Sequence, residues 1–299
     1  MWTAFLFAPD DYHIRRVQME QNDKTKEGQQ ENKDDVQKIL DDVLEELRQR
    51  VKENGFKVRI NENKSPVVIF NLFSPHSYFT DDTVLTIADA ILTGSDYGSK
   101  LREWYQLYPD RGYGAGFRRW AASKKIRPRF SWGNGSAMRV SPIGFAFDTL
   151  DEVLDEARKS AEPSHNHPEG IKGAQAVAAS VFLARKGCSK EYIRGYIAGA
   201  FSYDLDRTVE RIRPIYRFDV SCQGSVPEAI IAFLESTDFE SAVRLAVSLG
   251  GDSDTIACMT GGMAEAYYGG VTEDISSQVL RMLDDKQRSV VNAFIARYR

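Results

Sequence analysis

The chain has 299 residues, of which 42% are hydrophobic and 27% are charged, as in an ordinary globular protein. Lys and Arg number 39 against 43 Asp and Glu, so the net charge of −4 argues against nucleic acid as a partner. No apolar run reaches the roughly 18 residues of a transmembrane helix, and the first ten residues lack the basic start of a signal peptide. Cys188, Cys222 and Cys258 follow no disulfide or zinc spacing, so we expect a cytoplasmic protein in a reducing compartment.

Residues 1–70 form an atypical charged segment. Residues 21–32 have almost no apolar side chain and are expected to be a linker or mobile loop. Apolar residues at three- and four-residue steps predict an amphipathic helix over 34–54. Alternation in 56–60 and an apolar run at 66–70 predict two strands joined by a turn, and residues 3–8 could form a third strand.

From residue 80 onward the pattern is helical, with short connections that carry Gly, Pro, Asn and Asp. No repeat of fixed period occurs, so a solenoid is excluded. We expect an all-α domain over 71–299 beside the α/β-like segment over 1–70. The predicted helices cover residues 81–94, 99–108, 115–122, 149–161, 168–186, 190–200, 205–212, 226–235, 238–248, 254–268 and 273–297.

The first candidate for chemistry is the sequence Phe-Thr-Asp-Asp-Thr at residues 79–83. One interpretation makes Thr80 the N-cap of the following helix, with Asp81 and Asp82 stabilising the positive end of its dipole. The other makes the motif part of a metal site, because adjacent carboxylates and hydroxyls are hard oxygen ligands of the kind that Mg²⁺ selects. The motif alone leaves both interpretations open.

A second acidic turn, Gly-Gly-Asp-Ser-Asp-Thr at residues 250–255, also opens a predicted helix. Its glycines allow the backbone torsions of a turn in which Asp252, Asp254 and Thr255 converge. Two such clusters, about 170 residues apart in the sequence, suggest one shared site. Four carboxylates in one small volume repel one another unless cations neutralise them, and two divalent ions would do so.

Two glycine-rich loops, residues 112–117 and 131–139, have bare backbone N–H groups of the kind that bind phosphate at helix starts. Neither loop matches Gly-x-x-x-x-Gly-Lys-Ser/Thr or follows a predicted strand, so the P-loop and Rossmann interpretations fail. Taken alone, each loop is either an ordinary turn or a ligand cradle.

Two histidines, His165 and His167, precede the helix predicted from residue 168. No cysteine or third histidine lies near them, so a helix cap or a ligand-orienting histidine is favoured over zinc. Cys222 lacks an assignable base and orienting partner, so we expect a small buried residue there and not a nucleophile.

Together these stretches resemble the ADP-ribosylglycohydrolase family. The resemblance implies a compact orthogonal all-α fold around two Mg²⁺ or Mn²⁺ ions. It also implies the ligands, which are Thr80, Asp81 and Asp82 for one ion and Asp252, Asp254 and Thr255 for the other. The matching stretches occur in the family's order within residues 71–270, and they are residues 79–83, 112–116, 133–139, 165–170 and 251–255.

By the same resemblance, the chain cleaves the N- or O-glycosidic bond between the distal ribose of ADP-ribose and an acceptor such as an Arg or Ser side chain. Its partner is then ADP-ribose, or an ADP-ribosylated protein or small molecule, and Asp82 is a catalytic carboxylate. The residues implied to contact that partner are Gly114, Gly116, Ser131, Trp132, Asn134, Gly135, Ser136, Met138 and His165.

The N-terminal segment departs from the family pattern. Members normally begin with a glycine-rich helix bearing a Gly-Asp pair, followed by a Tyr-Glu-Phe-like segment whose Glu lies near the metals. Residues 1–66 contain no Tyr-Glu pair, and Glu62 is the nearest glutamate at a similar distance from the Thr-Asp-Asp-Thr motif. The leading hypothesis is a Mg²⁺-dependent glycohydrolase. Glu62 is a candidate for its acid/base by position alone, and the other interpretation makes it a solvated turn residue. The alternative is an ADP-ribose-binding protein that lacks the glutamate, and a structural protein is disfavoured because it needs no metal ligands.

A Glu62→Gln variant distinguishes a recruited acid/base from a solvated turn residue. If Glu62 transfers a proton, the variant loses turnover by about 10²- to 10⁴-fold and keeps its affinity for ADP-ribose. Parent and variant are compared side by side for turnover and for ADP-ribose binding. Equal turnover would end the proposal for Glu62.

Overall fold

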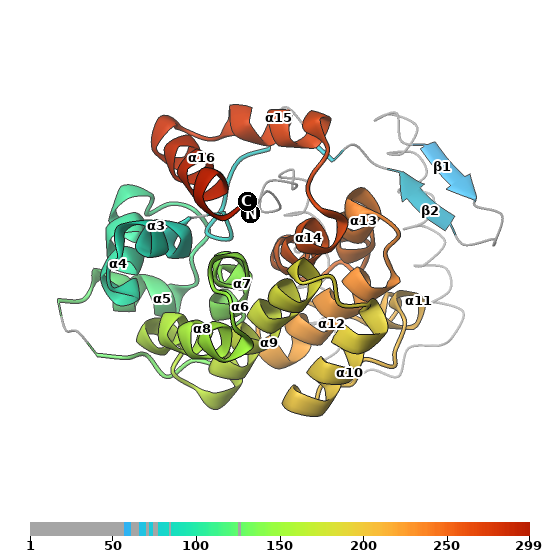
Figure 1. Ribbon diagram of the computed structural model, residues 1–299, viewed down its shortest axis with the longest axis horizontal. Coiled ribbons are helices and arrows are strands. Elements are labelled where there is room, and N and C mark those ends of the chain that lie inside the picture. The colour runs from blue at the N-terminus through green and yellow to red at the C-terminus, as the bar shows by residue number, and fades with distance from the viewer. Residues whose placement is uncertain (1–56, 61–65, 70–71, 74–76, 84, 125–126) are drawn as a thin grey trace, which may run out of the picture. The chain divides into compact units, whose positions relative to one another are not determined.

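The computed structural model describes most of the C-terminal three quarters of the chain and a short hairpin before it (Figure 1). The linker predicted over 21–32, the helix predicted over 34–54 and the strand predicted over 3–8 lie outside the described residues. The described residues are 57–60, 66–69, 72–73, 77–83, 85–124 and 127–299.

The hairpin consists of strands β1 (Lys57–Ile60) and β2 (Pro66–Ile69). The strands are antiparallel, with Lys57 opposite Ile69 and Ile60 opposite Pro66. Both strands confirm the prediction from period-two alternation and a short apolar run. The boundary at residue 70 between two domains stays a prediction.

Residues 77–299 form one compact unit made of helices (Figure 1). This confirms the all-α class predicted from the sequence. The helices are α3 (Thr86–Thr93), α4 (Tyr97–Leu107), α5 (Ala115–Ala122), α6 (Gly135–Met138), α7 (Ser141–Ala146), α8 (Leu150–His165), α9 (Pro168–Arg185), α10 (Lys190–Phe201), α11 (Val209–Ile212), α12 (Cys222–Glu235), α13 (Phe239–Ser248), α14 (Ser253–Tyr268), α15 (Glu273–Met282) and α16 (Asp285–Tyr298).

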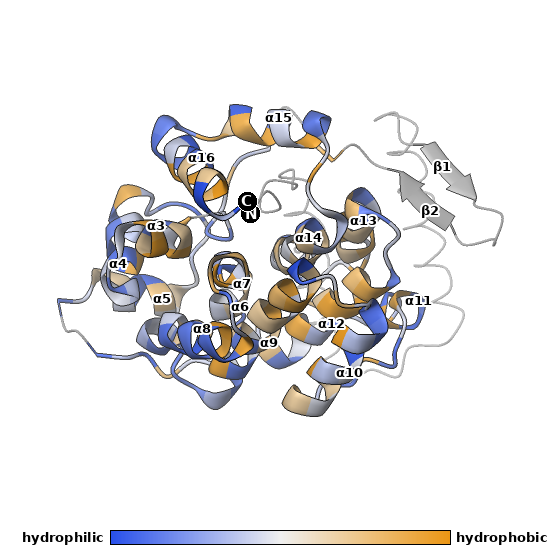
Figure 2. Cartoon of the chain, viewed as in Figure 1, coloured by the Kyte–Doolittle hydropathy of each residue, from blue (hydrophilic) through white to orange (hydrophobic). Residues whose placement is uncertain are grey.

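The core of this unit lies where α9, α12 and α14 pack against one another. Val177, Ile230 and Met259, one from each helix, have no exposed surface. Helices that are apolar on all sides belong in a protein interior, and Figure 2 shows such segments on α9 and α12. The helix α14, which begins at the second acidic turn, is therefore held inside the domain along its length.

Small residues let these central helices approach closely. A Cβ atom added at Gly173 of α9 would lie 2.5 Å from Sγ of Cys222 on α12. One added at Gly262 of α14 would overlap Ser141 of α7. Interiors are packed too densely to absorb such overlaps without movement, so these contacts fix how the helices cross. Cys222 is fully buried, as predicted.

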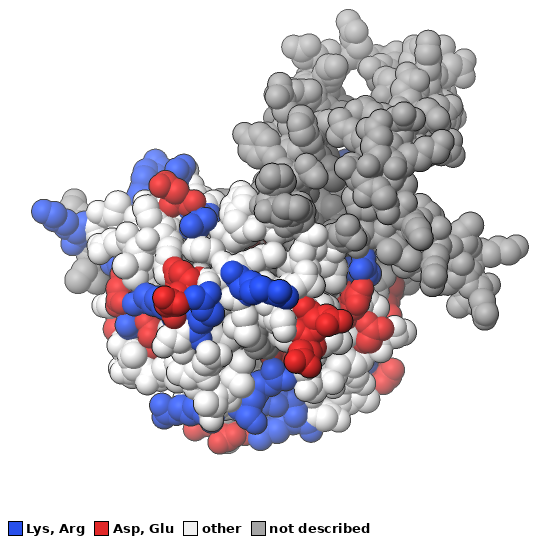
Figure 3. Space-filling view, turned by 90° about the horizontal axis from the view of Figure 1, so that it is seen from above, with Lys and Arg blue, Asp and Glu red and all other residues white. Residues whose placement is uncertain are grey.

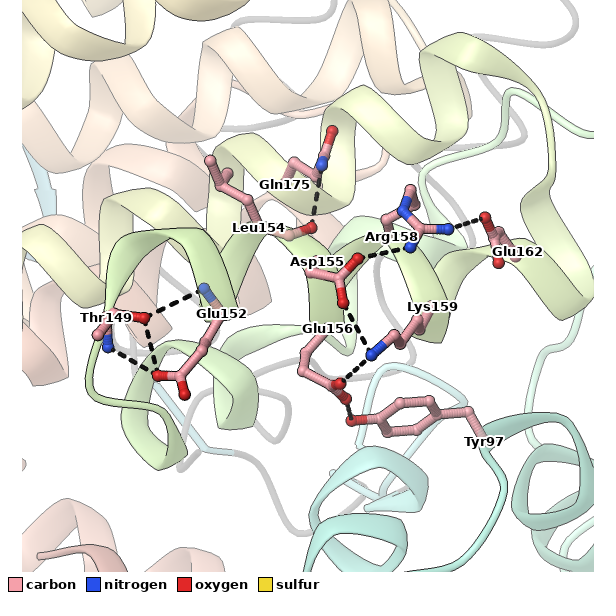
Figure 4. A network of polar contacts seen from close by, with 10 residues as sticks. All are labelled: Tyr97, Thr149, Glu152, Leu154, Asp155, Glu156, Arg158, Lys159, Glu162 and Gln175. Atoms are coloured by element: carbon pink, nitrogen blue, oxygen red, sulfur yellow. Dashed lines mark hydrogen bonds and ion pairs between the residues drawn. The ribbon is translucent and has the colours of Figure 1, made fainter.

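The surface helix α8 is tied to its neighbours by side chains that Figure 4 shows. Its first turn is closed by a capping box, in which Thr149 and Glu152 each accept a hydrogen bond from the other's backbone. Glu156 accepts a hydrogen bond from Tyr97 of α4 at 2.7 Å, and Gln175 of α9 donates to the carbonyl of Leu154 at 2.9 Å. These contacts fix α8, which carries His165 as its last residue.

The observed helices differ from the predicted ones at several ends. The helix predicted from residue 81 begins at Thr86, because residues 80–83 form a turn in which the N–H of Thr83 bonds to the carbonyl of Thr80 at 3.0 Å. The helix predicted over 273–297 is two helices, since Asp284 starts a new capping box with Gln287. The segment predicted over 205–212 is helical only from Val209.

Other ends lie outside the predicted limits. Helix α12 begins at Cys222, four residues before its predicted start, because Ser221 caps it by accepting a bond from the N–H of Gly224. Helix α8 continues to His165 through Pro163, beyond the predicted end at 161. The helices α6 and α7 were not predicted, because they are too short to show the hydrophobic periodicity of a helix.

Charges of both signs lie in neighbouring groups on the face of the domain seen in Figure 3. In the described part of the chain, no helix combines the length and the apolar composition that crossing a bilayer requires.

The last residue of the sequence, Arg299, pairs with a buried carboxylate of α14, Glu265, at 2.8 Å. Glu265 is 1% exposed, and the Arg299 side chain is 28% exposed. We expect Arg299→Ala to lower the free energy of unfolding by about 2 kcal/mol, because it removes a hydrogen-bonded cation from a buried carboxylate. Thermal unfolding measures the effect, and the exposed Arg297→Ala is the matched control. Equal melting temperatures for the two variants would contradict the expectation.

Candidate functional site

The two acidic turns of the sequence meet in one place in the fold. Burial raises the pKa of Asp81 to about 7, and the negative charges of Asp254 and Asp252 add to the rise. Burial also raises the pKa of Asp82 well above its usual range, with further contributions from Asp254, Asp81 and Asp252. Charges change one another's pKa in this way only when they lie close together. The structure therefore brings together two pairs of carboxylates that are about 170 residues apart in the sequence.

The loop before α3 presents the first pair of carboxylates. The N–H of Asp81 donates to the carbonyl of Arg111 at 2.6 Å, which ties this loop to the one that precedes α5. Thr80 donates its hydroxyl to Oδ2 of Asp82 at 3.2 Å, and Thr255 of α14 also makes a side-chain hydrogen bond to Asp82. Asp82 is 7% exposed, so its carboxylate is held between the two turns and largely shielded from water.

The start of α14 presents the second pair. Gly250 and Gly251 have φ angles of +70° and +66°, a region that glycine enters without steric cost. The ring of Tyr216 lies against Gly251, where an added Cβ would come within 2.6 Å of its Cε1. This turn places Asp252 at the N-cap of α14 and Asp254 in its first turn. Both the glycine torsions of this turn and the helix that follows it were predicted from the sequence.

The donor set fits a divalent cation. One oxygen of Asp82, Oδ1, is buried and has no hydrogen-bond partner, which is costly for a carboxylate unless a cation lies beside it. Hard carboxylate and hydroxyl oxygens are also the ligands that Mg²⁺ and Mn²⁺ prefer. As the side chains stand, no three His, Cys, Asp or Glu among the described residues are arranged to hold an ion.

A buried cation, Arg139, lies between the carboxylates and the glycine-rich loops. Burial lowers its pKa to about 10, while the negative charge of Asp81 acts in the opposite direction. Its guanidinium donates to Oγ of Ser164 and lies 3.3 Å from Nδ1 of His165. Arg139 lies at the end of the 131–139 loop, and the sequence alone assigns it no role. Its signal is that it interrupts the otherwise uncharged stretch 130–147.

His165 is a neutral imidazole. Burial, and then the positive charges of Arg139 and Arg129, hold its pKa well below its usual range. Ser164 lies 2.8 Å from its Nδ1, and the guanidinium of Arg139 can only donate, so Nδ1 is the acceptor. Nε2 therefore carries the hydrogen, and it is the ring nitrogen that lies nearer the glycines of the 133–135 loop.

The loop over residues 131–139 is fixed to the start of α12. Gly133 and Ser221 form an isolated β-bridge, in which the N–H of Asn134 donates to Val220 at 2.8 Å and the N–H of Cys222 donates to Trp132 at 2.9 Å. Ser136 is buried and donates its hydroxyl to the carbonyl of Gly170 at 2.8 Å. Ser131, Asn134 and Met138 are buried as well. Most side chains of the predicted ligand loop thus serve to hold its backbone in place.

Two aromatic side chains beside this loop are exposed. Trp132 is 54% exposed and Phe130 is 68% exposed, and both rings meet the edge of His167, at 5.7 Å and 4.6 Å between centroids. His167 itself is the N-cap of α9 and accepts a bond from the N–H of Glu169, so the capping interpretation of this histidine is confirmed. More than half of the Trp132 side chain is therefore accessible beside the histidine.

The second glycine-rich loop leads into α5. Gly114 is the N-cap of α5, and a Cβ added there would meet no atom within 4 Å. A Cβ added at Gly116 would overlap the guanidinium of Arg129, which would have to move aside. Tyr113 stacks on Phe117 with centroids 5.2 Å apart, and burial, followed by the charge of Asp81, raises the pKa of the Tyr113 hydroxyl. This loop therefore borders the carboxylate cluster. Glu62, predicted as the acid/base, lies outside the described residues.

Comparisons with known proteins agree with the resemblance noted in the sequence. The family model described as ADP-ribosylglycohydrolase matches residues 31–298. The mouse protein named ADP-ribosylhydrolase ARH3 is 30% identical, over 64% of this chain and 70% of that protein. The ADP-ribosylarginine hydrolase Tri1 of Pseudomonas putida is 25% identical, over 64% of this chain and 59% of that protein. A solved structure titled ADP-ribosylglycohydrolase-related protein complex aligns with a TM-score of 0.56 at 26% identity, covering 74% of this chain and 82% of that one.

Gly135 tests whether the 131–139 loop faces a ligand. A Cβ added there would lie 3.1 Å from Cε1 and Nε2 of His165, so a larger side chain must displace the imidazole. We expect Gly135→Val to weaken ADP-ribose binding by about tenfold or more, a loss of about 1.4 kcal/mol, without unfolding the domain. Calorimetry measures the dissociation constant.

The control is Gly195→Val, at an exposed position of α10 where an added Cβ meets nothing within 4 Å. Equal affinities for ADP-ribose in the two variants would make the 131–139 loop an ordinary turn.

Proposed function

Since the chain belongs to the ADP-ribosylglycohydrolase family, we propose that it is a metal-dependent hydrolase that releases ADP-ribose from an acceptor. The bond we assign to it is the glycosidic bond at the distal ribose. The proposal is supported by a group of four carboxylates in which burial and the charges of Asp254 and Asp252 raise the pKa of Asp81 and Asp82, and in which a buried oxygen of Asp82 has no hydrogen-bond partner. Such a group is costly by itself and favourable around divalent cations.

We assign two ions, Mg²⁺ or Mn²⁺, to the cluster. When bound, such ions neutralise the carboxylates and stabilise negative charge that develops on the reacting oxygens. A threonine hydroxyl would complete the ligands of each ion. The side chain of Thr255, from the second turn, already makes a hydrogen bond to Asp82 in the first. The residues that would hold the ions are Thr80, Asp81 and Asp82 on one side and Asp252, Asp254 and Thr255 on the other.

The nucleotide end of the ligand would lie along the two glycine-rich loops. Gly114 leaves open space at the start of α5, where free backbone N–H groups favour a phosphate. The Nε2–H of His165 is directed towards the 133–135 loop and can donate to an oxygen there. The exposed ring of Trp132 would stack on the base. We infer that the acceptor end then lies at the carboxylates.

We assign proton transfer in the reaction to carboxylate side chains. We propose Asp82, which is buried against Thr80 and Thr255, and Glu62, which lies between β1 and β2 in the sequence. A general base must come within hydrogen-bond reach of the proton it takes, either directly or through one water. The missing Tyr-Glu pair in residues 1–66 keeps a second candidate function in view, a protein that binds ADP-ribose without cleaving its bond. We also propose a cytosolic location, in which the three free cysteines remain thiols.

Incubation with an ADP-ribosylated serine or arginine peptide separates the two functions. The hydrolase releases free ADP-ribose in the presence of Mg²⁺ or Mn²⁺ and stops when a chelator removes the metal. The binding protein retains ADP-ribose and releases none from either peptide. Binding of neither peptide nor ADP-ribose would contradict both.

Loss of one carboxylate from either turn should abolish metal binding. We expect Asp81→Ala and Asp254→Ala each to weaken Mn²⁺ affinity by about 100-fold or more, because each removes a charged ligand from the cluster. Calorimetric titration with Mn²⁺ decides, and Asp274→Ala on the exposed side of α15 is the charge-matched control. Unchanged affinity in both cluster variants would remove the two-ion model.

A further inference from the structure

One side chain joins the ligand loop to the carboxylate cluster. The amide nitrogen of Asn134 donates to Oδ2 of Asp252 at 2.7 Å and to Oγ of Ser225 at 3.0 Å. All three residues are buried, with Asn134 at 6%, Asp252 at 7% and Ser225 at 0% exposure. The contact spans 118 positions of the sequence and connects α6, α12 and α14.

The orientation of this amide follows from its partners. The carboxylate of Asp252 can only accept a hydrogen bond when it is ionised, and the hydroxyl of Ser225 already donates to the carbonyl of Asp219 at 2.9 Å. Both partners therefore need a donor, and the two hydrogens of the amide nitrogen supply one each. A flipped amide would place its oxygen against a carboxylate oxygen at 2.7 Å, which is repulsive.

The backbone of Asn134 is engaged as well. Its N–H donates to the carbonyl of Val220 at 2.8 Å, and its carbonyl accepts from the N–H groups of Ala137 and Met138. With its backbone and amide nitrogen bonded within the protein, only the amide oxygen of Asn134 is left for a ligand. The side chain that the sequence placed among the substrate contacts thus has another use.

We propose that Asn134 is a positioning residue that orients the carboxylate of Asp252 for metal binding from within the nucleotide loop. This inference rests on the proposed function, since it takes Asp252 as a metal ligand. By holding Oδ2, Asn134 fixes the rotation of the carboxylate about its side chain. Partners of this kind, which touch the ligand and not the ion, typically change metal affinity by about 10- to 100-fold when they are removed.

Calorimetric titration with Mn²⁺ tests the proposal on the intact chain. We expect Asn134→Ala to weaken Mn²⁺ affinity by about 10- to 100-fold. Asn134→Ser should lose a similar amount, because its shorter side chain cannot reach Asp252, and it serves if the alanine variant does not fold. ADP-ribose affinity measured without metal should stay within about threefold of the parent, because the Gly133–Ser221 bridge still holds the loop.

Ser225→Ala is the matched control. It removes the other acceptor of the same amide and leaves the bond to Asp252, so Mn²⁺ affinity should remain within about threefold of the parent. Melting temperatures of all variants separate a structural effect from a metal effect, because a purely structural role lowers the melting temperature of both variants and leaves Mn²⁺ affinity unchanged.

A parent that binds Mn²⁺ and an Asn134→Ala variant that binds it equally well would overturn this inference alone. A parent that binds neither Mn²⁺ nor Mg²⁺ would overturn the proposed metal site and this inference with it.

Discussion

The repulsion among four carboxylates, of which Asp82 and Asp252 are buried, is the interaction on which the site depends. Burial, and then the negative charges of Asp254 and Asp252, raise the pKa of Asp81 and Asp82, and one oxygen of Asp82 is buried without a hydrogen-bond partner. A protein retains such an arrangement only where the surrounding fold imposes it. Here two turns impose it, one before α3 and one before α14, and each turn is fixed by bonds that do not involve the carboxylates themselves.

The helical core provides this fixation. Helix α14 is buried along most of its length between α9, α12 and α13, so its first turn cannot move away from the loop before α3. Cys258 of α14 donates to the carbonyl of Met138 at 3.1 Å, which holds the 131–139 loop against the same helix. The nucleotide loop and the carboxylates are therefore fastened to one rigid element, and Asn134 adds a direct bond between them.

Much of this could be predicted from residue types. Adjacent Thr and Asp residues at two predicted helix starts indicated the carboxylate cluster. The parts that sequence could not supply depend on tertiary contact. The interruption of an uncharged stretch by Arg139 does not show that its guanidinium is buried close to Asp81 and His165. Asn134 looked like a ligand contact because nothing in the sequence shows that Asp252 lies beside it.

The central claim is that the carboxylates are a site for divalent ions, and anomalous scattering from crystals grown with Mn²⁺ tests it most directly. The account predicts two manganese peaks, one against Asp81 and Asp82 and the other against Asp252 and Asp254. Carboxylate oxygens should lie about 2.0–2.3 Å from the ions, the range for small divalent cations. Anomalous maps with no peak beside these four residues, at Mn²⁺ concentrations that saturate the protein in solution, would contradict the account.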